Sequence, residues 1–222
     1  KKSTSSLVAF LDGDMAVKED WLESYLSFFN KNTVAVMGDN IPPKDAMLNP
    51  IEKYYFSKVR GARQFSSGSK ISFQYMLYGN AMVKRKILVE CGMFDEKIKK
   101  YGGEDTDLSI RIWEKYPNQF IFSNKSNSTH FQRRNLEEFC NQLKAYGSSN
   151  FLLLYERYPY YSAELGTDLI NSFKGILIFN PIIKTIIKLI YLIFPFQIFI
   201  RYMVIDSVVC GARSSSKIKT DK

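Results

Sequence analysis

The sequence is poor in the residues that build disulfide frameworks and zinc sites. Its 222 residues include three cysteines, Cys91, Cys140 and Cys210, and a single histidine, His130. An odd number of cysteines at these spacings matches no zinc ligand set and excludes a disulfide-rich scaffold. We therefore expect reduced, mostly buried thiols, as in a cytosolic protein.

Long apolar runs are also scarce. In the apolar segment 176–209, the longest stretch without a charged residue is the 12 residues from Leu189 to Ile200. A spanning helix needs about 20 residues. Lys184 and Lys188 are four residues apart, on one helical face, which favours an amphipathic helix lying in the membrane interface. A proline-broken re-entrant hairpin and a core helix pair remain alternatives.

Negative charge is outweighed by positive charge. The 31 basic and 22 acidic side chains give a net charge of +9, which favours anionic partners such as phosphates, nucleotides or acidic lipids. Part of this excess lies in a basic tail at 213–222. No known nucleic-acid motif frames the basic residues, so we do not expect a nucleic-acid partner.

The acidic residues that are present gather at two points. Glu104, Asp105 and Asp107 follow two glycines and precede an apolar run. Isolated buried carboxylates are costly, so this density indicates a site rather than a core. A carboxylate at a helix start is a candidate general base, although acidic residues also favour helix N-termini for capping alone.

The second acidic pair is Asp12 and Asp14. It follows the apolar run 7–11, which predicts a strand buried on both faces. Two carboxylates at the carboxyl end of a strand are suited to a divalent cation, although acidic residues are also common in turns. His130 follows a short predicted strand at 120–122, and a neutral imidazole would complete an Asp/His/phosphate ligand set. A lone histidine is also compatible with a purely structural role.

The remaining pattern predicts alternating helices and strands. Apolar periodicity and capping residues favour a second strand and a series of helices. We predict the strand at 33–38 and helices at 18–30, 50–60, 84–91, 104–116 and from Asn135 towards 157.

With these motifs in order, the chain resembles the family 2 glycosyltransferases of the GT-A fold. The resemblance covers about 7–159. It is carried by "LVAFLDGD" at 7–14, "YGNAMVKRKILVECGMFDE" at 78–96, "YGGEDTDLSIRIW" at 101–113, and "STH" at 128–130 ahead of a helix containing "AYG". The nucleotide-binding strand–helix–strand half of such enzymes has no match, so we expect an N-terminally truncated chain.

The resemblance implies roles for individual residues. Asp105 would be the catalytic base and Glu104 would contact the acceptor. Asp12 would contact the ribose or the metal, and Asp14 and His130 would be metal ligands.

Three further residues are substrate-binding by the same resemblance. Gly79 and Asn80 would line the pocket for the donor sugar and acceptor, and Gly103 would lie beside the acidic motif.

The fold implied is α/β: a partial GT-A, Rossmann-like mixed sheet flanked by helices, with a C-terminal amphipathic or hydrophobic helical extension. We predict a catalytic and acceptor half at 1–159, a membrane-associated helical segment at 160–212, and the basic tail at 213–222.

The function implied is metal-dependent, inverting transfer of a sugar from a nucleotide sugar to a hydroxyl acceptor. The cofactor would be manganese or magnesium. The acceptor would be a lipid-linked or nascent glycan of the cell envelope or surface polysaccharide, at the cytoplasmic face of the membrane, with the protein peripheral or monotopic. The alternatives are a non-catalytic membrane-associated binding module and a phosphoryl-transfer enzyme with Asp12 as nucleophile. The latter usually has a threonine where this chain has Ala16.

Overall fold

The chain forms two compact units. A computed structural model describes residues 3–131 and 133–220, and Lys222 of the predicted basic tail lies outside them. The first unit, the sheet unit, comprises Lys1–Met47, Tyr55–Glu96 and Glu104–Gln132; the second, the helical unit, comprises Leu48–Tyr54, Lys97–Gly103 and Arg133–Lys222. Both units are therefore assembled from segments that are distant in the sequence.

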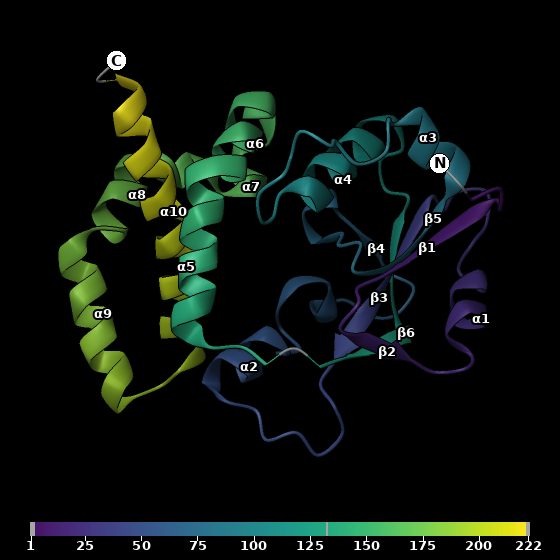
Figure 1. Ribbon diagram of the computed structural model, residues 1–222, viewed down its shortest axis with the longest axis horizontal. Coiled ribbons are helices and arrows are strands. Elements are labelled where there is room, and N and C mark those ends of the chain that lie inside the picture. The colour runs from purple at the N-terminus through teal and green to yellow at the C-terminus, as the bar shows by residue number, and fades with distance from the viewer. Residues whose placement is uncertain (1–2, 132, 221–222) are drawn as a thin grey trace. The chain divides into compact units, whose positions relative to one another are not determined.

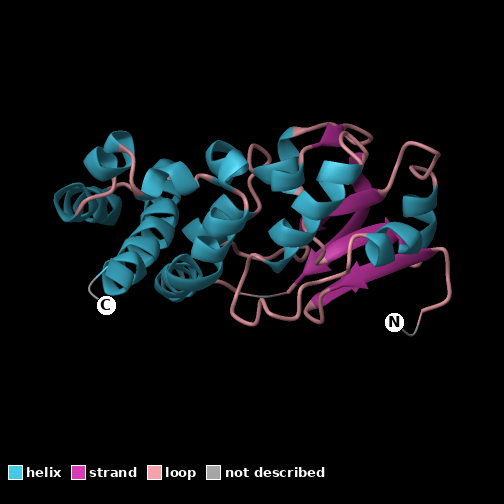
Figure 2. Ribbon diagram, turned by 90° about the horizontal axis from the view of Figure 1, so that it is seen from above, coloured by secondary structure: helices cyan, strands magenta, loops and turns pink. Residues whose placement is uncertain are grey.

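A mixed six-stranded sheet forms the sheet unit (Figures 1 and 2). Its path runs β1-β5-β3-β6-β2, with β4 paired to β6. Only β3 and β6 run parallel among the described strands; the other pairs are antiparallel. The strands are β1 (Leu7–Leu11), β2 (Met15–Val17), β3 (Ala35–Ile41), β4 (Lys70–Ile71), β5 (Asn80–Lys84) and β6 (Phe120–His130).

Strand β1 forms where the sequence predicts it, but the expectation that it is buried on both faces is wrong. It stands at one end of the strand path and pairs only with β5 among the described strands. Leu11 is 39% exposed. An apolar run reports β propensity, whereas the position of the strand in the sheet decides how much of it is covered.

Strand β6 is longer than the predicted strand at 120–122 because polar residues continue it. Phe120 and Phe122 are buried, and beyond them Ser126 and Ser128 are buried as well. The hydroxyl groups are satisfied: Ser128 donates to the Asn40 side chain at 2.9 Å. Hydrogen bonding removes the penalty of burying a hydroxyl, so the strand continues as far as His130.

Three helices accompany the sheet. The predicted helix at 18–30 is shorter than expected, and the helix of the acidic motif begins at Glu104 as predicted. These helices are α1 (Trp21–Leu26), α3 (Arg85–Glu90) and α4 (Glu104–Lys115). Short 3-10 turns lie at Gly61–Gln64 and Phe73–Tyr75.

The helical unit holds the remaining helices and most of α2. No helix in the described part of the chain combines the length and apolar character needed to cross a membrane. The helices are α2 (Pro50–Tyr55), α5 (Leu136–Tyr146), α6 (Leu152–Arg157), α7 (Ser162–Leu165), α8 (Phe173–Ile178), α9 (Pro181–Ile193) and α10 (Gln197–Thr220). A π turn at Gly147–Phe151 joins α5 to α6, and 3-10 turns lie at Pro159–Tyr161 and Thr167–Ile170.

Helix α5 starts as the sequence predicts and packs closely on α10 (Figure 1). The Asn135 side chain accepts hydrogen bonds from the backbone N–H groups of Glu137 and Glu138, which is N-capping. A Cβ on Gly147 would collide with the Val208 carbonyl group. Small residues at such a point let two backbones approach where any side chain would hold them apart.

The core of the helical unit lies between α2, α5 and α10. Phe139 of α5 packs with Ile200 and Met203 of α10. Arg213, the first residue of the predicted basic tail, donates to the backbone carbonyl groups of Ile170 and Phe179 at 2.7 and 2.6 Å. This side chain is thereby bound within the helical unit.

Candidate active site

Asp12 and Gly79 are brought into contact where β1 ends and β5 begins. The Asp12 N–H donates to the Gly79 carbonyl group at 2.9 Å. A Cβ on Gly79 would collide with the Asp12 carboxylate, so glycine is required for the side chain to lie there. Partial burial raises the pKa of Asp12, the neighbouring Asp14 raises it further, and His130 opposes the rise.

Asp14, which directly precedes β2, faces His130, the last residue of β6. Met15 is paired in register with His130, and the Phe131 N–H donates to the Asp14 carbonyl group at 3.0 Å. The Asp14 Oδ2 atom lies 3.2 Å from the His130 Nε2 atom. The imidazole is buried, whereas the Asp14 side chain is 40% exposed. The two predicted metal ligands therefore meet at one point that is open to solvent.

Two aromatic rings hold the imidazole in place. The ring centroids of Tyr55 and Phe56 lie 5.8 and 6.3 Å from that of His130. The Nδ1 atom of His130 is buried and has no hydrogen-bond partner in the described residues. Packing rather than a second hydrogen bond thus orients the ring, and no sequence pattern predicted this.

The pair is chemically suited to a divalent cation. A carboxylate oxygen and an imidazole nitrogen are ligand types that manganese accepts. Across the described residues, no group of three or more His, Cys, Asp or Glu side chains is arranged to hold a metal ion. A cation held here would have these two protein ligands, and its other positions would be left to water and substrate oxygens.

Asp105 lies in the first turn of α4, within electrostatic reach of the Asp12 carboxylate. The Tyr78 N–H donates to its Oδ2 atom at 3.0 Å. Burial raises the pKa of Asp105 to about 7, and the charges of Glu104 and Asp12 contribute to the rise. A carboxylate with a pKa near the working pH is suited to act as a general base.

Glu104, directly before Asp105, has one carboxylate oxygen without a hydrogen-bond partner among the described residues. This atom, Oε2, is buried. Buried polar atoms normally have a partner, so an oxygen left without one is suited to a ligand hydroxyl group.

Asn80 performs a structural task that the sequence did not reveal. Its side chain is buried and accepts from Trp21 Nε1 at 3.0 Å and from the Tyr25 hydroxyl group at 2.7 Å. Its amide donates to the carbonyl groups of Asp39 and Ser126. Because these bonds occupy its amide group, the side chain ties α1, β3 and β6 to β5, and any substrate contact at this position would come from the backbone.

Gly103 belongs to the helical unit and has a positive φ of 96°. A Cβ there would press against Asn150 and Tyr146 at 3.1 and 3.3 Å. Its conformation and this packing account for glycine, while its contact with a substrate stays a prediction.

Asp107, the third carboxylate of the acidic motif, is fully buried. It forms an ion pair with Arg111 one turn later, at 2.7 Å. Arg111 also donates to the backbone carbonyl groups of Cys91 and Met93. The pair anchors α4 to the turn after α3, and so fixes the helix that carries Asp105. The i, i+4 spacing was visible in the sequence, but its burial was not.

Comparison with known proteins points to one class of enzyme, although no family model matches the chain. The pre-mycofactocin glycosyltransferase of Mycobacterium tuberculosis is 31% identical over 114 residues, which cover 50% of this chain and 24% of that protein. The glucosyl-dolichyl phosphate glucuronosyltransferase of Haloferax volcanii is 24% identical over 137 residues, covering 57% and 43%.

A solved structure gives the fold. The mannosyltransferase PcManGT of Pyrobaculum calidifontis, in complex with GDP-Man and Mn²⁺, superposes with a TM-score of 0.52 at 14% identity. The match covers 96% of this chain and 62% of that one. The chain is a relative of the glycosyltransferases and has a GT-A-type fold.

This relationship confirms the predicted family and fold class. The chain spans less than half the length of the two curated relatives. At such identity and coverage, the metal and the substrates of those proteins are not carried over to this chain. Roles for its individual residues are argued from its own geometry.

Proposed function

We propose that the chain carries the base-bearing part of an inverting glycosyltransferase, which moves a sugar from a nucleotide sugar to a hydroxyl acceptor. One observation carries the proposal: Asp105, with its pKa raised to about 7, stands within electrostatic reach of Asp12, which itself neighbours the Asp14–His130 pair. General base and candidate metal ligands thus belong to one cluster.

The proposed reaction is a single displacement. The Asp105 carboxylate accepts the proton of the acceptor hydroxyl group, and the oxygen attacks the anomeric carbon of the donor sugar. The bond between that carbon and the diphosphate oxygen breaks, and the nucleoside diphosphate leaves with the electron pair. Glu104 binds the acceptor through its unused oxygen, and the Tyr78 N–H keeps the base oriented.

Asp14 and His130 would hold a divalent cation, manganese or magnesium. Bound there, it would supply positive charge against the diphosphate leaving group. The buried imidazole and the exposed carboxylate leave room on the solvent side for the diphosphate itself.

The proposed place of action is the cytoplasmic face of the membrane, with a lipid-linked or nascent glycan of the cell envelope as acceptor. In support, α8, α9 and the connection to α10 expose large apolar side chains, among them Phe173, Ile182 and Leu192. No acidic residue lies between Asp168 and Asp206. An apolar and basic surface of this kind favours an anionic bilayer.

The test uses the complete protein. It is mixed with a panel of sugar nucleotides, manganese and membrane extract, and release of nucleoside diphosphate is measured. Asp105→Asn should lower turnover by about 10²–10⁴-fold. Glu114→Gln, an exposed carboxylate on the same helix, should leave turnover unchanged. Equal activity in both variants would remove Asp105 from the mechanism.

The metal site has a separate readout. Asp14→Asn should weaken manganese binding, measured by electron paramagnetic resonance, while the exposed Glu19→Gln should not. The anomeric configuration of the product, read by NMR, decides between inversion and retention. A phosphorylated Asp12 trapped from any substrate would favour the phosphoryl-transfer alternative instead.

A further inference from the structure

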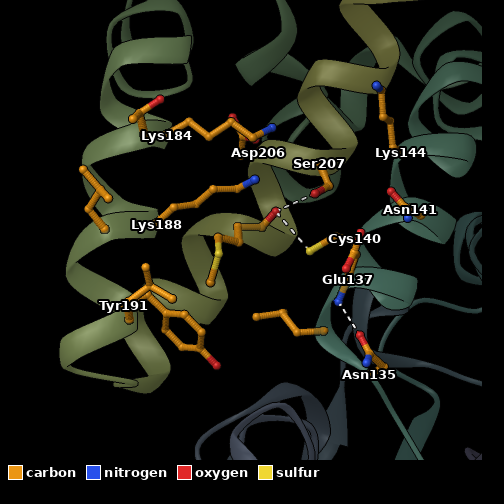
Figure 3. Close-up of a pocket in the computed structure, with 15 residues that line it drawn as sticks. Asn135, Glu137, Cys140, Asn141, Lys144, Lys184, Lys188, Tyr191, Asp206 and Ser207 are labelled. Atoms are coloured by element: carbon orange, nitrogen blue, oxygen red, sulfur yellow. Dashed lines mark hydrogen bonds and ion pairs between the residues drawn. The ribbon is translucent and has the colours of Figure 1, made fainter.

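A cavity of about 820 Å³ lies inside the helical unit, between α5, α9 and α10 (Figure 3). This volume is in the range of small-molecule and cofactor sites. Its wall includes apolar side chains from all three helices: Leu136, Leu189, Tyr191, Leu192 and Met203. The active-site residues proposed above belong to the sheet unit, so the cavity is not explained by them.

Two lysines of α9 project into this cavity. Lys184 ends against Asp206 of α10, with its Nζ atom 2.6 Å from a carboxylate oxygen that is buried. Asp206 is 3% exposed, so this carboxylate is neutralised within the wall by Lys184. The pair fixes α9 against α10 and leaves no net charge of its own.

Lys188, one helical turn later, has no such partner. Figure 3 shows its side chain reaching from α9 into the cavity. Among the described residues it forms no ion pair, and the Lys184–Asp206 pair is complete without it. Its charge is felt at the Cys140 thiol: burial raises the pKa of Cys140, while a hydrogen bond with Ser207 and the charges of Lys184 and Lys188 oppose the rise. Lys144 and Glu137 of α5 also line the cavity, so its wall carries three lysines and two carboxylates. Lys188 is exposed at the mouth of the cavity and adds a positive charge that no ion pair neutralises among the described residues.

The cavity is continuous with the exposed apolar face of α9. Leu189 and Leu192 line the cavity and are also 59% and 79% exposed. Ile182, Ile186 and Ile193 extend this face along the helix. A ligand with an anionic head in the cavity could thus lay its hydrocarbon chains along the outer face of α9.

We propose that this cavity binds the phosphate headgroup of a membrane lipid, with Lys188 as its counter-ion and α9 against the acyl chains. Charge complementarity carries the choice of ligand, because lysines outnumber carboxylates in the cavity wall by three to two. The segment between Asp168 and Asp206 has basic residues and no acidic ones. The apolar rim at Leu189 and Leu192 favours a lipid over a free anion. The proposal concerns binding alone and does not depend on the transferase activity.

Vesicle binding tests the choice of ligand. The full-length protein is sedimented with vesicles of phosphatidylcholine alone or mixed with phosphatidic acid, without any sugar nucleotide. The mixed vesicles should bind more tightly, and Lys188→Gln should weaken that binding about tenfold or more. Lys174→Gln removes one exposed charge from the same segment and should cost no more than about fivefold. Lys188→Arg, which keeps the charge, should bind like the unchanged protein.

Labelling of Cys140 tests whether the lipid enters the cavity. In a Cys210→Ser background, where Cys91 is buried, a water-soluble maleimide should react with Cys140 several-fold more slowly when short-chain phosphatidic acid is present. Inorganic phosphate at the same concentration should not protect the thiol, and Lys188→Gln should abolish protection by the lipid.

Three outcomes would overturn the proposal. Equal weakening by Lys188→Gln and Lys174→Gln would mean that diffuse surface charge accounts for binding. Unchanged Cys140 labelling despite vesicle binding would place the lipid outside the cavity. Protection by inorganic phosphate as strong as that by lipid would make the ligand a free anion.

Discussion

In the sheet unit, acidic side chains stand at strand and helix ends and are only partly neutralised. Asp12, Asp14 and Asp105 lie near one another, and the pKa values of Asp12 and Asp105 are raised. In the helical unit, the cavity side of α9 carries lysines and its outer face carries apolar side chains. The first arrangement is suited to chemistry and the second to an anionic surface.

The difference shows how each unit treats a buried charge. Asp107 in the sheet unit and Asp206 in the helical unit are both buried and both paired with a cation of known position. Asp105 and Lys188 have no such ion pair among the described residues: Asp105 accepts a hydrogen bond from the Tyr78 N–H, and Lys188 lines the cavity. Charges that stabilise the fold are thus distinguished from charges available to a ligand.

The largest effect on stability is expected at the buried pair of α4. Arg111→Met leaves Asp107 buried without its counter-ion and should lower the free energy of unfolding by about 3 kcal/mol. Lys115→Met breaks the exposed pair with Glu90 on the same helix and should change it by less than about 1 kcal/mol. Urea denaturation measures both, and similar values would contradict the distinction between buried and exposed pairs.

The stability of the helical unit is expected to depend on the close backbone contact between Gly147 and Val208. Gly147→Ala forces a Cβ into the Val208 carbonyl group and should destabilise this unit by about 1–3 kcal/mol. Gly13→Ala, where a Cβ would meet nothing within 4 Å, is the control in the sheet unit. Hydrogen exchange of the backbone amides of α5 and α10 locates the effect. Unchanged protection of these amides in Gly147→Ala would argue against close packing of α5 on α10.

A pH-dependent effect is expected at Asp105. Its pKa of about 7 in the folded state exceeds the ordinary value of 3.8, so unfolding releases a proton between these pH values. Stability therefore falls as pH rises from the ordinary pKa of 3.8 to about 7, and this group causes no further change above that range, where it is ionised in both states. Asp105→Asn should be more stable than the unchanged protein by about 1–3 kcal/mol at pH 8, and equal to it below pH 4. Thermal unfolding at the two pH values measures this, and equal stability at pH 8 would mean an ordinary pKa.

The smallest effect on stability is expected on the outer face of α9. Leu192→Gln alters a side chain that is 79% exposed and should change the free energy of unfolding by less than about 0.5 kcal/mol. It should nevertheless weaken vesicle binding several-fold. Loss of stability without loss of vesicle binding would show that this face packs against protein instead.

Much of the candidate site could be predicted because its residues are of types that are recognisable in a sequence. Asp12, Asp14, Glu104, Asp105 and His130 stand out as charged or rare residues at element ends. The structure brings His130 to Asp14, and Asp105 within reach of Asp12, although up to 116 residues separate them in sequence.

The structural roles of residues that depend on neighbours distant in the sequence could not be predicted. The substrate-pocket role of Asn80 stays a prediction, but the sequence did not show that the hydroxyl and indole donors of α1 hold its side chain in a buried hydrogen-bond network. The acidic motif likewise did not show that Asp107 is buried, which its ion pair with Arg111 allows. In each case the deciding partner is a contact that periodicity does not report.

The sequence by itself determined the family resemblance, the acidic motifs, the helix starts at Glu104 and Asn135, and the acid-free apolar segment. These features are local, because propensity, capping and charge spacing act over a few residues. Only the tertiary structure decided that β1 is an edge strand of the described sheet, that β6 continues to His130, and that Lys188 faces a cavity while Lys184 is paired. Burial and electrostatic environment are sums over neighbours far along the chain, and folding alone sets them.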